Sequence, residues 1–401
     1  MLRRGFVKLH RWFGLGAAAF LFIAGFTGAI ISWDHELDAW LNPSFYQARG
    51  QGPARPALVL AAAVEAAEPR ARIRFMPLEA EPGQTLLISL EPRLDPATGR
   101  PHDLGYNQIA VDPATGDIQA RREWGQTSLS RENLLPFLYK LHYSLHLPKA
   151  WGLELGVLLM GVLAILWVFD CFIALWISFP SLATWRQSFS FRWRQGGPRL
   201  VFDLHRSGGV WAWFLLLILA VTSVSMNLNT QVMRPLVSRF SRLTPSPFER
   251  RAGQVIPAED MAGDPRVSMA RAVDLAQAEA HRRGWTAPPG GVFFSAETAL
   301  WGVGFFKAGQ SHGDGGLGNP WLYFDAHSGE SLGADVPGTG SAGDIFLQAM
   351  FPLHSGRILG LPGRILVSLL GLAVATLSAT GILIWLRRRR SEGRVRSLRR
   401  P

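Results

Sequence analysis

Four histidines lie where polar segments of the chain give way to long apolar runs. His10 and His205 precede the first and third runs, and His142 and His354 precede the second and fourth. Neutral imidazole is a common axial ligand of haem iron, and two imidazoles from different helices can hold one porphyrin between them. The pattern therefore predicts two b-type haems per chain, one bound by His10 and His205 and the other by His142 and His354.

Arginines and glycines beside these histidines suit the same cofactor. Arg11, Arg206 and Arg357 can pair with the propionate groups of a haem, because a guanidinium binds carboxylates through two parallel hydrogen bonds. Glycines leave room for a flat ring to approach a helix closely. The glycines expected to do so are Gly14, Gly208, Gly209 and Gly356.

Two further residues leave alternatives open. His146 follows His142 by four positions and shares its face on a helix expected over 133–147, so either can be the ligand. Asp170 lies inside the second apolar run, where a carboxylate is costly and needs a partner. It is either a structural hydrogen-bonded group, a support for a haem ligand, or a proton or quinol site. Zinc is the competing metal, but it needs further ligands, and His10 and His205 have none close in sequence.

The four apolar runs have the length of membrane-spanning helices. About 20 residues cross about 30 Å of hydrocarbon, and the runs cover 12–33, 155–179, 208–228 and 365–386. The net charge is +11, and arginine and lysine concentrate before the first run, between the second and third, and after the fourth. This distribution indicates a membrane protein with both termini in the cytoplasm, and it argues against a nucleic-acid partner.

These boundaries predict a membrane α-helical fold with a four-helix bundle and two periplasmic α+β domains. In chain order we expect helix 1 with a cytoplasmic N-terminus (1–33), a first periplasmic domain (34–149), helix 2 (150–180), a basic cytoplasmic loop (181–206), helix 3 (207–229), a second periplasmic domain (230–360), helix 4 (361–387) and an arginine-rich cytoplasmic tail (388–401). The single cysteine, Cys171, excludes a disulfide within the chain, and the absence of a Cys-x-x-Cys-His motif excludes covalently attached haem.

Each predicted periplasmic segment combines a helix with short strands. In the first we expect a linker and an Ala-rich helix over 53–67, followed by strands over 73–75, 85–90, 106–111 and 117–122. In the second we expect a helix over 268–283 and strands over 292–295, 300–306, 321–324 and 331–334, with a Gly-rich loop over 309–319. The turn sequences 112–116 and 325–329 predict a β-hairpin in each segment.

The two halves of the chain repeat the same features in the same order. His10 and His205 are 195 residues apart, as are Gly14 and Gly209. The turns that start at Asp112 and Asp325 are 213 residues apart. A tandem duplication of the unit helix, outer module, helix explains these offsets, and because both copies start on the same side the repeats are parallel.

Several motifs together resemble a known family. The segments 9–14 (LHRWFG), 203–209 (DLHRSGG), 141–145 (LHYSL) and Asp170-Cys171 are similar to those of the PepSY-associated transmembrane proteins, which are often iron-regulated. Within that family the chain is most similar to inner-membrane di-haem siderophore reductases. The resemblance implies PepSY-like domains outside, and haem bound at His10, His205, His142 and His354. It also implies reduction of iron(III) held by a siderophore in the periplasm.

The expected function is therefore transmembrane electron transfer, as a ferric-siderophore reductase embedded in the lipid bilayer. The sequence shows no dinucleotide or flavin motif, so the electron donor would be a cytoplasmic partner or a membrane quinol. The alternative is a non-enzymatic PepSY membrane module that binds a periplasmic protein or peptide, as a regulator or assembly factor. A transporter of the intact chelate is a third hypothesis, for which four spans and one intramembrane charge offer a poor pathway.

Overall fold

A computed structural model describes residues 2–252, 264–313 and 315–397. Arg399 and Arg400 of the expected tail, and residues 253–263 of the second outer segment, lie outside the described residues. The chain divides into two compact units. The helical unit comprises residues 1–34, 138–240 and 349–401, and the sheet unit comprises residues 35–137 and 241–348.

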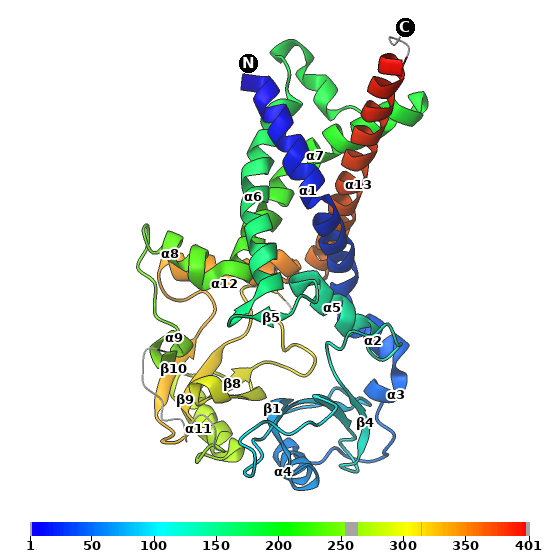
Figure 1. Cartoon of the computed structure of the whole chain (residues 1–401). Helices are drawn as coiled ribbons and strands as arrows, with labels where there is room; N and C mark the ends of the chain where they lie inside the picture. The colour runs from blue at the N-terminus through cyan, green and yellow to red at the C-terminus, as the bar shows by residue number, and fades with distance from the viewer. Residues whose placement is uncertain (1, 253–263, 314, 398–401) are drawn as a thin grey trace. The chain divides into compact units, whose positions relative to one another are not determined.

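Four long helices run side by side in the helical unit (Figure 1). They are α1 (Leu2–Ile31), α6 (Leu155–Ser178), α7 (Gly197–Leu228) and α13 (Leu361–Ser397). Each is long and apolar enough to cross a membrane, which confirms that the four predicted apolar runs form helices of membrane-spanning length. Three of them extend beyond the apolar runs, because the basic segments at 2–11, 197–207 and 387–397 continue the same helices. The chain thus has the build of a membrane protein.

The four helices pack in a fixed set of pairs. α1 packs mainly against α13, and α6 against α7, while α7 also contacts α13. A small apolar core of Leu216, Leu219, Leu370 and Val374 fills the interior, with Trp167 packed against it. At one end of α1 the indole of Trp33 donates a hydrogen bond to Ser368 Oγ at 2.9 Å, which fixes the start of α13 beside it.

Short elements connect the long helices. They are α5 (Leu134–Ser144), the hairpin β5 (Lys149–Ala150) and β6 (Leu153–Glu154), the 3-10 turns η1 (Leu182–Phe189), η2 (Trp193–Gln195) and η5 (Arg357–Leu359), the π-turn η3 (Asn229–Met233), α8 (Arg234–Val237) and α12 (Ala342–Ser355). The helix expected over 133–147 ends at Ser144, because Leu145 and His146 adopt φ values of 53° and 54°. That left-handed backbone stops an α-helix, so His146 does not share the helical face of His142, and this part of the prediction is wrong.

The sheet unit is built on one antiparallel sheet of eight strands. Its order is β10-β9-β8-β7-β1-β2-β3-β4. The strands are β1 (Ala71–Pro77), β2 (Leu86–Pro92), β3 (Gln108–Val111), β4 (Ile118–Arg122), β7 (Pro289–Ser295), β8 (Leu300–Phe305), β9 (Trp321–Asp325) and β10 (Ser331–Asp335). The segments 34–149 and 230–360 each supply four consecutive strands to this sheet, and β1 pairs with β7 around Phe75 and Phe293. The two expected modules are thus two halves of one sheet, since pairing removes an exposed edge from each.

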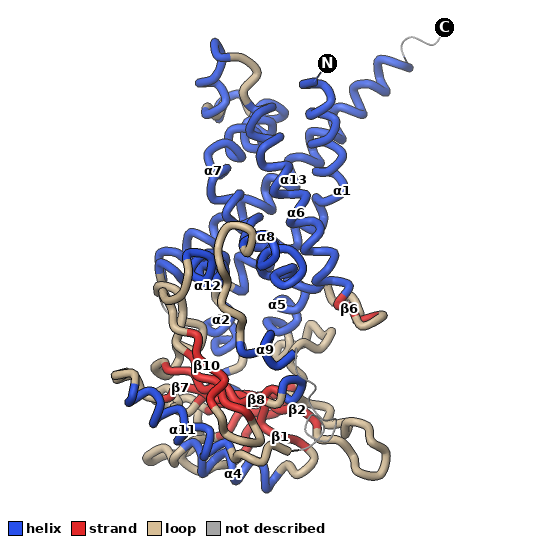
Figure 2. Tube along the Cα trace, turned by 90° about the vertical axis from the view of Figure 1, so that its left-hand side faces the viewer, coloured by secondary structure: helices blue, strands red, loops and turns tan. Residues whose placement is uncertain are grey.

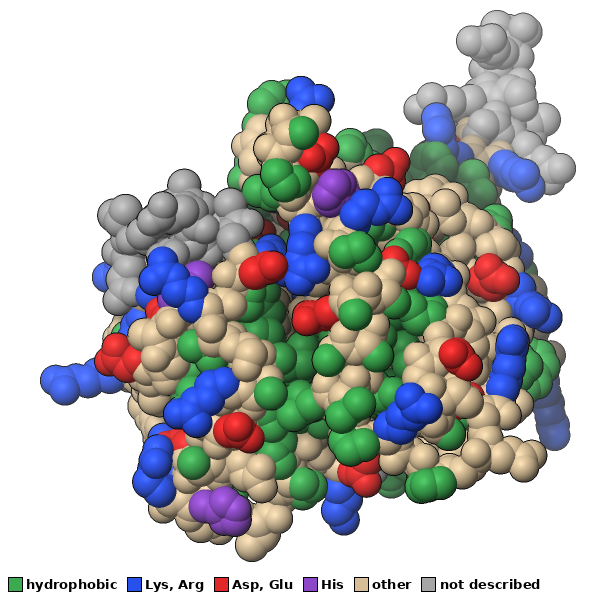
Figure 3. Space-filling model, turned by 90° about the horizontal axis from the view of Figure 1, so that it is seen from below, with side chains coloured by type: hydrophobic (Ala, Val, Ile, Leu, Met, Phe, Trp, Pro, Cys, Tyr) green, Lys and Arg blue, Asp and Glu red, His purple; other side chains and the backbone are tan. Residues whose placement is uncertain are grey.

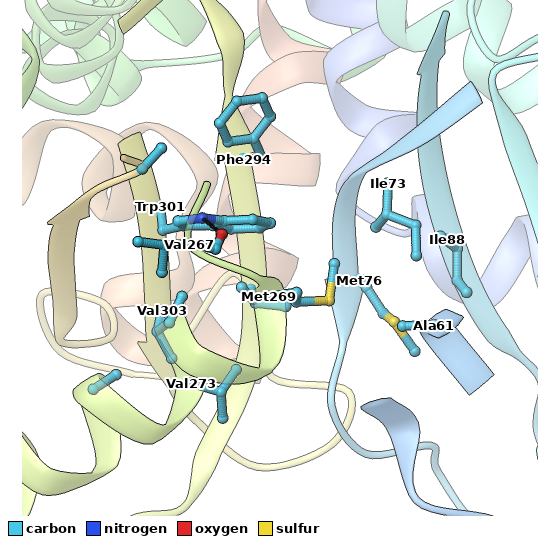
Figure 4. Packing of buried hydrophobic residues seen from close by; sticks show 14 of the residues in the cluster. Ala61, Ile73, Met76, Ile88, Val267, Met269, Val273, Phe294, Trp301 and Val303 are labelled. Atoms are coloured by element: carbon cyan, nitrogen blue, oxygen red, sulfur yellow. Dashed lines mark hydrogen bonds between the residues drawn. The ribbon is translucent and has the colours of Figure 1, made fainter. Parts of the chain in front are cut away.

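Two helices cover one face of this sheet (Figure 2). α4 (Ala57–Ala67) packs on β1, and α11 (Met269–Arg282) packs on β7, β8 and β9. The core between helices and sheet joins both halves, with Met76 and Ile88 from one and Val292 and Val303 from the other, all fully buried. Figure 4 shows this packing, in which Trp301 Nε1 donates to the carbonyl of Val267 at 2.9 Å.

The two predicted hairpins form as expected. β3 pairs with β4 and β9 with β10, both antiparallel. In each turn an aspartate accepts backbone hydrogen bonds: Asp112 Oδ1 from Ala114 and Thr115, and Asp325 Oδ1 from His327 and Ser328. An aspartate that bonds the backbone two and three residues ahead stabilises a tight turn, which is why the same sequence pattern ends both strands.

The remaining helices of the sheet unit are α2 (Asp34–Leu41), α3 (Pro43–Tyr46), α9 (Pro247–Ala252) and the 3-10 turn η4 (Ala296–Thr298). A buried ion pair ties α2 to the sheet, where Arg122 Nη1 donates to Asp38 Oδ2 at 2.7 Å. Tyr46 donates to the same oxygen at 2.6 Å. Seen from below, the unit shows apolar side chains in the middle of the face and charged side chains of both signs mixed around them (Figure 3).

Candidate functional site

The four predicted histidines meet in two pairs within the helical unit. His10 of α1 and His205 of α7 have ring centres 6.0 Å apart, with an angle of 54° between the rings. His142 of α5 and His354 of α12 have ring centres 6.2 Å apart at 57°. We call these the α1–α7 pair and the α5–α12 pair. The structure thus brings the imidazoles together in the combinations that the sequence predicts.

Both spacings suit a single metal atom between two imidazoles. A bond from imidazole nitrogen to a metal is about 2 Å long. Adding about 1 Å from each nitrogen to the centre of its own ring gives about 6 Å between ring centres for two such bonds. The measured separations of 6.0 and 6.2 Å agree with this sum.

Threonines on the long helices orient the α5–α12 pair. Nδ1 of His142 lies 3.0 Å from the carbonyl oxygen of Ala24 and 3.1 Å from Thr27 Oγ1, both on α1. Nδ1 of His354 lies 3.0 Å from Thr222 Oγ1 on α7. Each threonine hydroxyl donates to a carbonyl of its own helix, so its oxygen accepts the imidazole N–H. This arrangement leaves Nε2 as the basic nitrogen of each ring, the form that binds a metal.

Burial keeps the α5–α12 pair neutral. It lowers the pKa of His142 to about 4 and, together with the neighbouring His142, that of His354 to about 3. Both rings therefore carry no charge at neutral pH, because desolvation disfavours the imidazolium. A neutral imidazole is the state that an axial ligand requires.

The two histidines of the α1–α7 pair are oriented by different groups. Nδ1 of His205 lies 3.0 Å from the carbonyl oxygen of Leu377 and 3.2 Å from Thr380 Oγ1, both on α13. Nδ1 of His10 instead lies 2.9 and 3.0 Å from the two carboxylate oxygens of Asp170 on α6. Of the alternatives left open for Asp170, the geometry matches support of the neighbouring histidine.

A cavity of about 470 Å³ is lined by both rings of the α1–α7 pair. Gly14 and Gly209, each one turn along its helix from a histidine of the pair, form part of its wall. A Cβ atom at Gly14 would meet nothing within 4 Å, and one at Gly209 would meet only Leu377 Cδ2 at 3.7 Å. The two glycines therefore leave open a space that side chains would fill.

Four arginines line the same cavity: Arg3, Arg11, Arg206 and Arg388. Nε of Arg206 is buried and lacks a hydrogen-bond partner within the described part of the chain. A buried donor without a partner is costly, and a carboxylate is the group that best satisfies a guanidinium. Paired imidazoles, apolar walls with glycine, and arginines in the lining fit a haem with its propionates.

The other predicted residues fall in different places. Arg357 lies in η5, directly after α12. Its charge counteracts the effect of burial, which raises the pKa of Tyr139, a residue one turn before His142 on α5. Gly356 was expected to admit a flat ring, and this is wrong. A Cβ there would come within 2.2 Å of the carbonyl oxygen of Gly363, so Gly356 serves the tight turn between α12 and α13.

Sequence reasoning missed the threonines that orient the rings. Thr27 and Thr222 are 195 residues apart, the same offset as His10 and His205, and each follows its histidine by 17 positions. That regularity was the available signal. In an α-helix, 17 positions correspond to about 25 Å, so the two pairs are held at levels far apart along α1 and α7.

The comparisons with known proteins agree with the membrane architecture. A family model described as "PepSY-associated TM region" matches residues 7–388. The match takes in all four histidines of the two pairs and the apolar parts of the four long helices. No curated protein matches the sequence.

Proposed function

The chain belongs to the PepSY-associated TM family, and from this premise we propose that it carries electrons across a membrane to iron(III) bound by a siderophore. The observation that supports this proposal most directly is the presence of two imidazole pairs, each with the spacing of two axial ligands of one metal. The α1–α7 pair and the α5–α12 pair would each hold one haem b. When bound, haem supplies reversible one-electron chemistry between iron(III) and iron(II).

Residues of the chain would place the two haems and exclude water from the space between them. The imidazoles fix the two redox centres at separate levels, since 17 helical positions separate His10 from Thr27 and His205 from Thr222. The apolar core around Leu216 and Leu219 keeps water and ions out of the space between these levels. An electron can then cross a layer in which a charged carrier would be costly.

Orientation in the membrane follows from the arginines. We propose that the protein lies in a bacterial inner membrane, because the basic ends of α1, α7 and α13 would face the cytoplasm. The α1–α7 pair would then lie on the cytoplasmic side, and the sheet unit in the periplasm. A tandem duplication would account for the shared offset of 195 residues in His10 and His205 and in Thr27 and Thr222, and for the four-plus-four order of the sheet.

The substrate class follows from the chemistry of iron. Iron(III) is held tightly by the hard oxygen ligands of a chelator, whereas iron(II) prefers softer ligands. One electron delivered to the chelate therefore loosens the iron without breaking a covalent bond. The donor of that electron would be a membrane quinol or a cytoplasmic redox protein, which gives up one electron for each iron reduced.

The test is an optical and kinetic experiment on the purified full-length protein. We expect b-type haem absorbance with about two haems per chain, one for each imidazole pair. The reduced protein should be re-oxidised by a ferric siderophore under anaerobic conditions. The same siderophore loaded with gallium(III), which accepts no electron, is the matched control and should leave the protein reduced.

A non-enzymatic PepSY module gives a different result. A folded preparation that binds no haem would contradict the proposal and favour the module that binds a periplasmic protein or peptide. A preparation could instead bind two haems and stay equally reduced with the gallium and the iron chelate. That result would be compatible with electron transfer but would exclude the ferric siderophore as the electron acceptor.

A further inference from the structure

The four imidazoles of the two pairs differ in what holds them. Those of His142, His205 and His354 bond neutral oxygens, namely helix carbonyls or threonine hydroxyls. The imidazole of His10 is the exception, because Nδ1 lies 2.9 and 3.0 Å from the oxygens of the Asp170 carboxylate. The site is therefore asymmetric, although the two helices that carry this pair repeat the same motif.

Asp170 is placed to act on His10. It lies in the middle of an apolar helix, only 8% exposed, where an isolated charge would be expelled. His10 is the only hydrogen-bond partner of this carboxylate in the described part of the chain. On α13, the side chain that contacts His205 is that of Thr380. A duplicated site that only needed a correctly oriented ring could have kept threonine here.

A carboxylate changes the ligand in a way that a threonine does not. An imidazole that donates its N–H to a carboxylate is a stronger electron donor through its other nitrogen. A stronger donor, with a negative charge close by, stabilises iron(III) relative to iron(II) and lowers the reduction potential. Each of the two histidines is followed in sequence by an arginine that lines the cavity, Arg11 after His10 and Arg206 after His205, so these arginines do not account for the difference between the two rings.

We propose that Asp170 is a positioning residue that lowers the midpoint potential of the haem bound by the α1–α7 pair. The inference rests on the proposed function. His10 and His205 would hold the haem that gives up one electron and is oxidised, and His142 and His354 would hold the haem that accepts this electron and is reduced. No bond is formed or broken. The low potential favours passage of the electron onward from the pair that Asp170 supports.

The test is a redox titration of the full-length protein with the substitution Asp170→Asn. Asparagine keeps the size of the side chain and removes its charge. We expect one of the two haem components to become at least tenfold easier to reduce, a shift of about 59 mV for one electron, while the other stays unchanged. In a His354→Ala background, which keeps only the haem of the α1–α7 pair, the remaining component should show the whole shift.

Two further variants keep the test decisive. Thr380→Val removes a neutral partner of His205 and should shift the same component by less than threefold. Asp170→Glu retains the charge, so the reduction equilibrium of the same haem should stay within threefold of that in the parent protein. This variant covers the case in which Asp170→Asn loses haem. The inference would be overturned if haem-loaded Asp170→Asn protein kept both midpoint potentials unchanged. It would also be overturned if Asp170→Glu changed the reduction equilibrium of this haem tenfold. A parent protein without haem would instead overturn the proposed function.

Discussion

Gly25 of α1 and Gly371 of α13 lie backbone against backbone in the helical unit. A Cβ atom on Gly25 would come within 2.6 Å of the carbonyl oxygen of Gly371, and one on Gly371 within 2.5 Å of that of Gly25. Helices that associate in lipid approach closely through such small residues, because packing rather than water exclusion holds them together. This contact joins the first half of the chain to the second.

Gly25→Leu should force α1 and α13 apart. Inserting a bulky side chain into a packed contact costs about 1–3 kcal/mol or more, so we expect a lower thermal midpoint in detergent. The matched control is Gly16→Leu on the same helix, where an added Cβ meets nothing within 4 Å. Equal thermal midpoints for the two variants would show that the close contact is not needed.

Single histidine substitutions should each remove one haem and leave the other. His142→Ala and His354→Ala should give the same haem content as each other, about one per chain, because either loss empties the same pair. His10→Ala and His205→Ala should behave likewise for the other pair. His281→Ala, on the exposed face of α11, is the control and should keep both haems. Haem content measured per chain decides the matter, and an unchanged value in any of the four variants argues against that ligand.

Gly209→Leu should block the α1–α7 site without unfolding the helix. Its side chain would enter the cavity of about 470 Å³, whose wall includes Gly209. The control is Gly208→Leu at the adjacent position. Gly208 does not line the cavity, and an added Cβ there meets nothing within 4 Å. We expect about one haem per chain in the first variant and two in the second, by the ligation argument above. Two haems in both variants would mean that the cavity is not the haem site.

Thr222→Val should weaken haem binding at the α5–α12 pair. The Thr222 hydroxyl orients His354 through Nδ1, and loss of such a partner typically costs about 10–100-fold in metal affinity. Thr376→Val, an exposed threonine of α13 whose hydroxyl bonds only its own helix, should leave the affinity unchanged. Competition for haem with an apoprotein of known affinity measures both. A result within twofold of the parent protein for Thr222→Val would contradict the role given to this hydroxyl.

The sheet unit should lose stability in acid through its turn aspartates. Burial alone would raise the pKa of Asp112, but the backbone N–H groups of Gly50, Thr115, Ala114 and Arg49 hold it below its ordinary value. A carboxylate with a depressed pKa in the folded state contributes stability above its unfolded pKa of about 3.9 and loses it as the pH falls further.

Asp112→Asn should therefore lower the free energy of unfolding by about 1–3 kcal/mol at neutral pH. It should also make this free energy fall less steeply with pH below about pH 4. Urea unfolding followed by tryptophan fluorescence at several pH values measures both effects. The control is Asp117→Asn, an exposed carboxylate in the same hairpin. A parent protein and an Asp112→Asn variant with parallel pH profiles would contradict the assignment.

The sequence alone determined the features that repeat along the chain. Apolar runs of membrane length predicted the four long helices, because crossing hydrocarbon requires a fixed number of residues. Turn chemistry at Asp112 and Asp325 predicted both hairpins, because an Asx turn is encoded within a few neighbouring residues. The positions of His10 and His205, each before an apolar run, predicted that these two rings pair. All three are local or periodic signals.

Only the tertiary structure decided which atoms meet across helices. β1 and β7 join two halves into one sheet, Asp170 contacts His10, and Thr222 contacts His354. Each of these is a contact between positions far apart in the sequence. Hydrophobic patterning fixes which face of an element is buried but not which partner covers it. The partner depends on the packing of whole helices and strands, and so on the free energy of the complete fold.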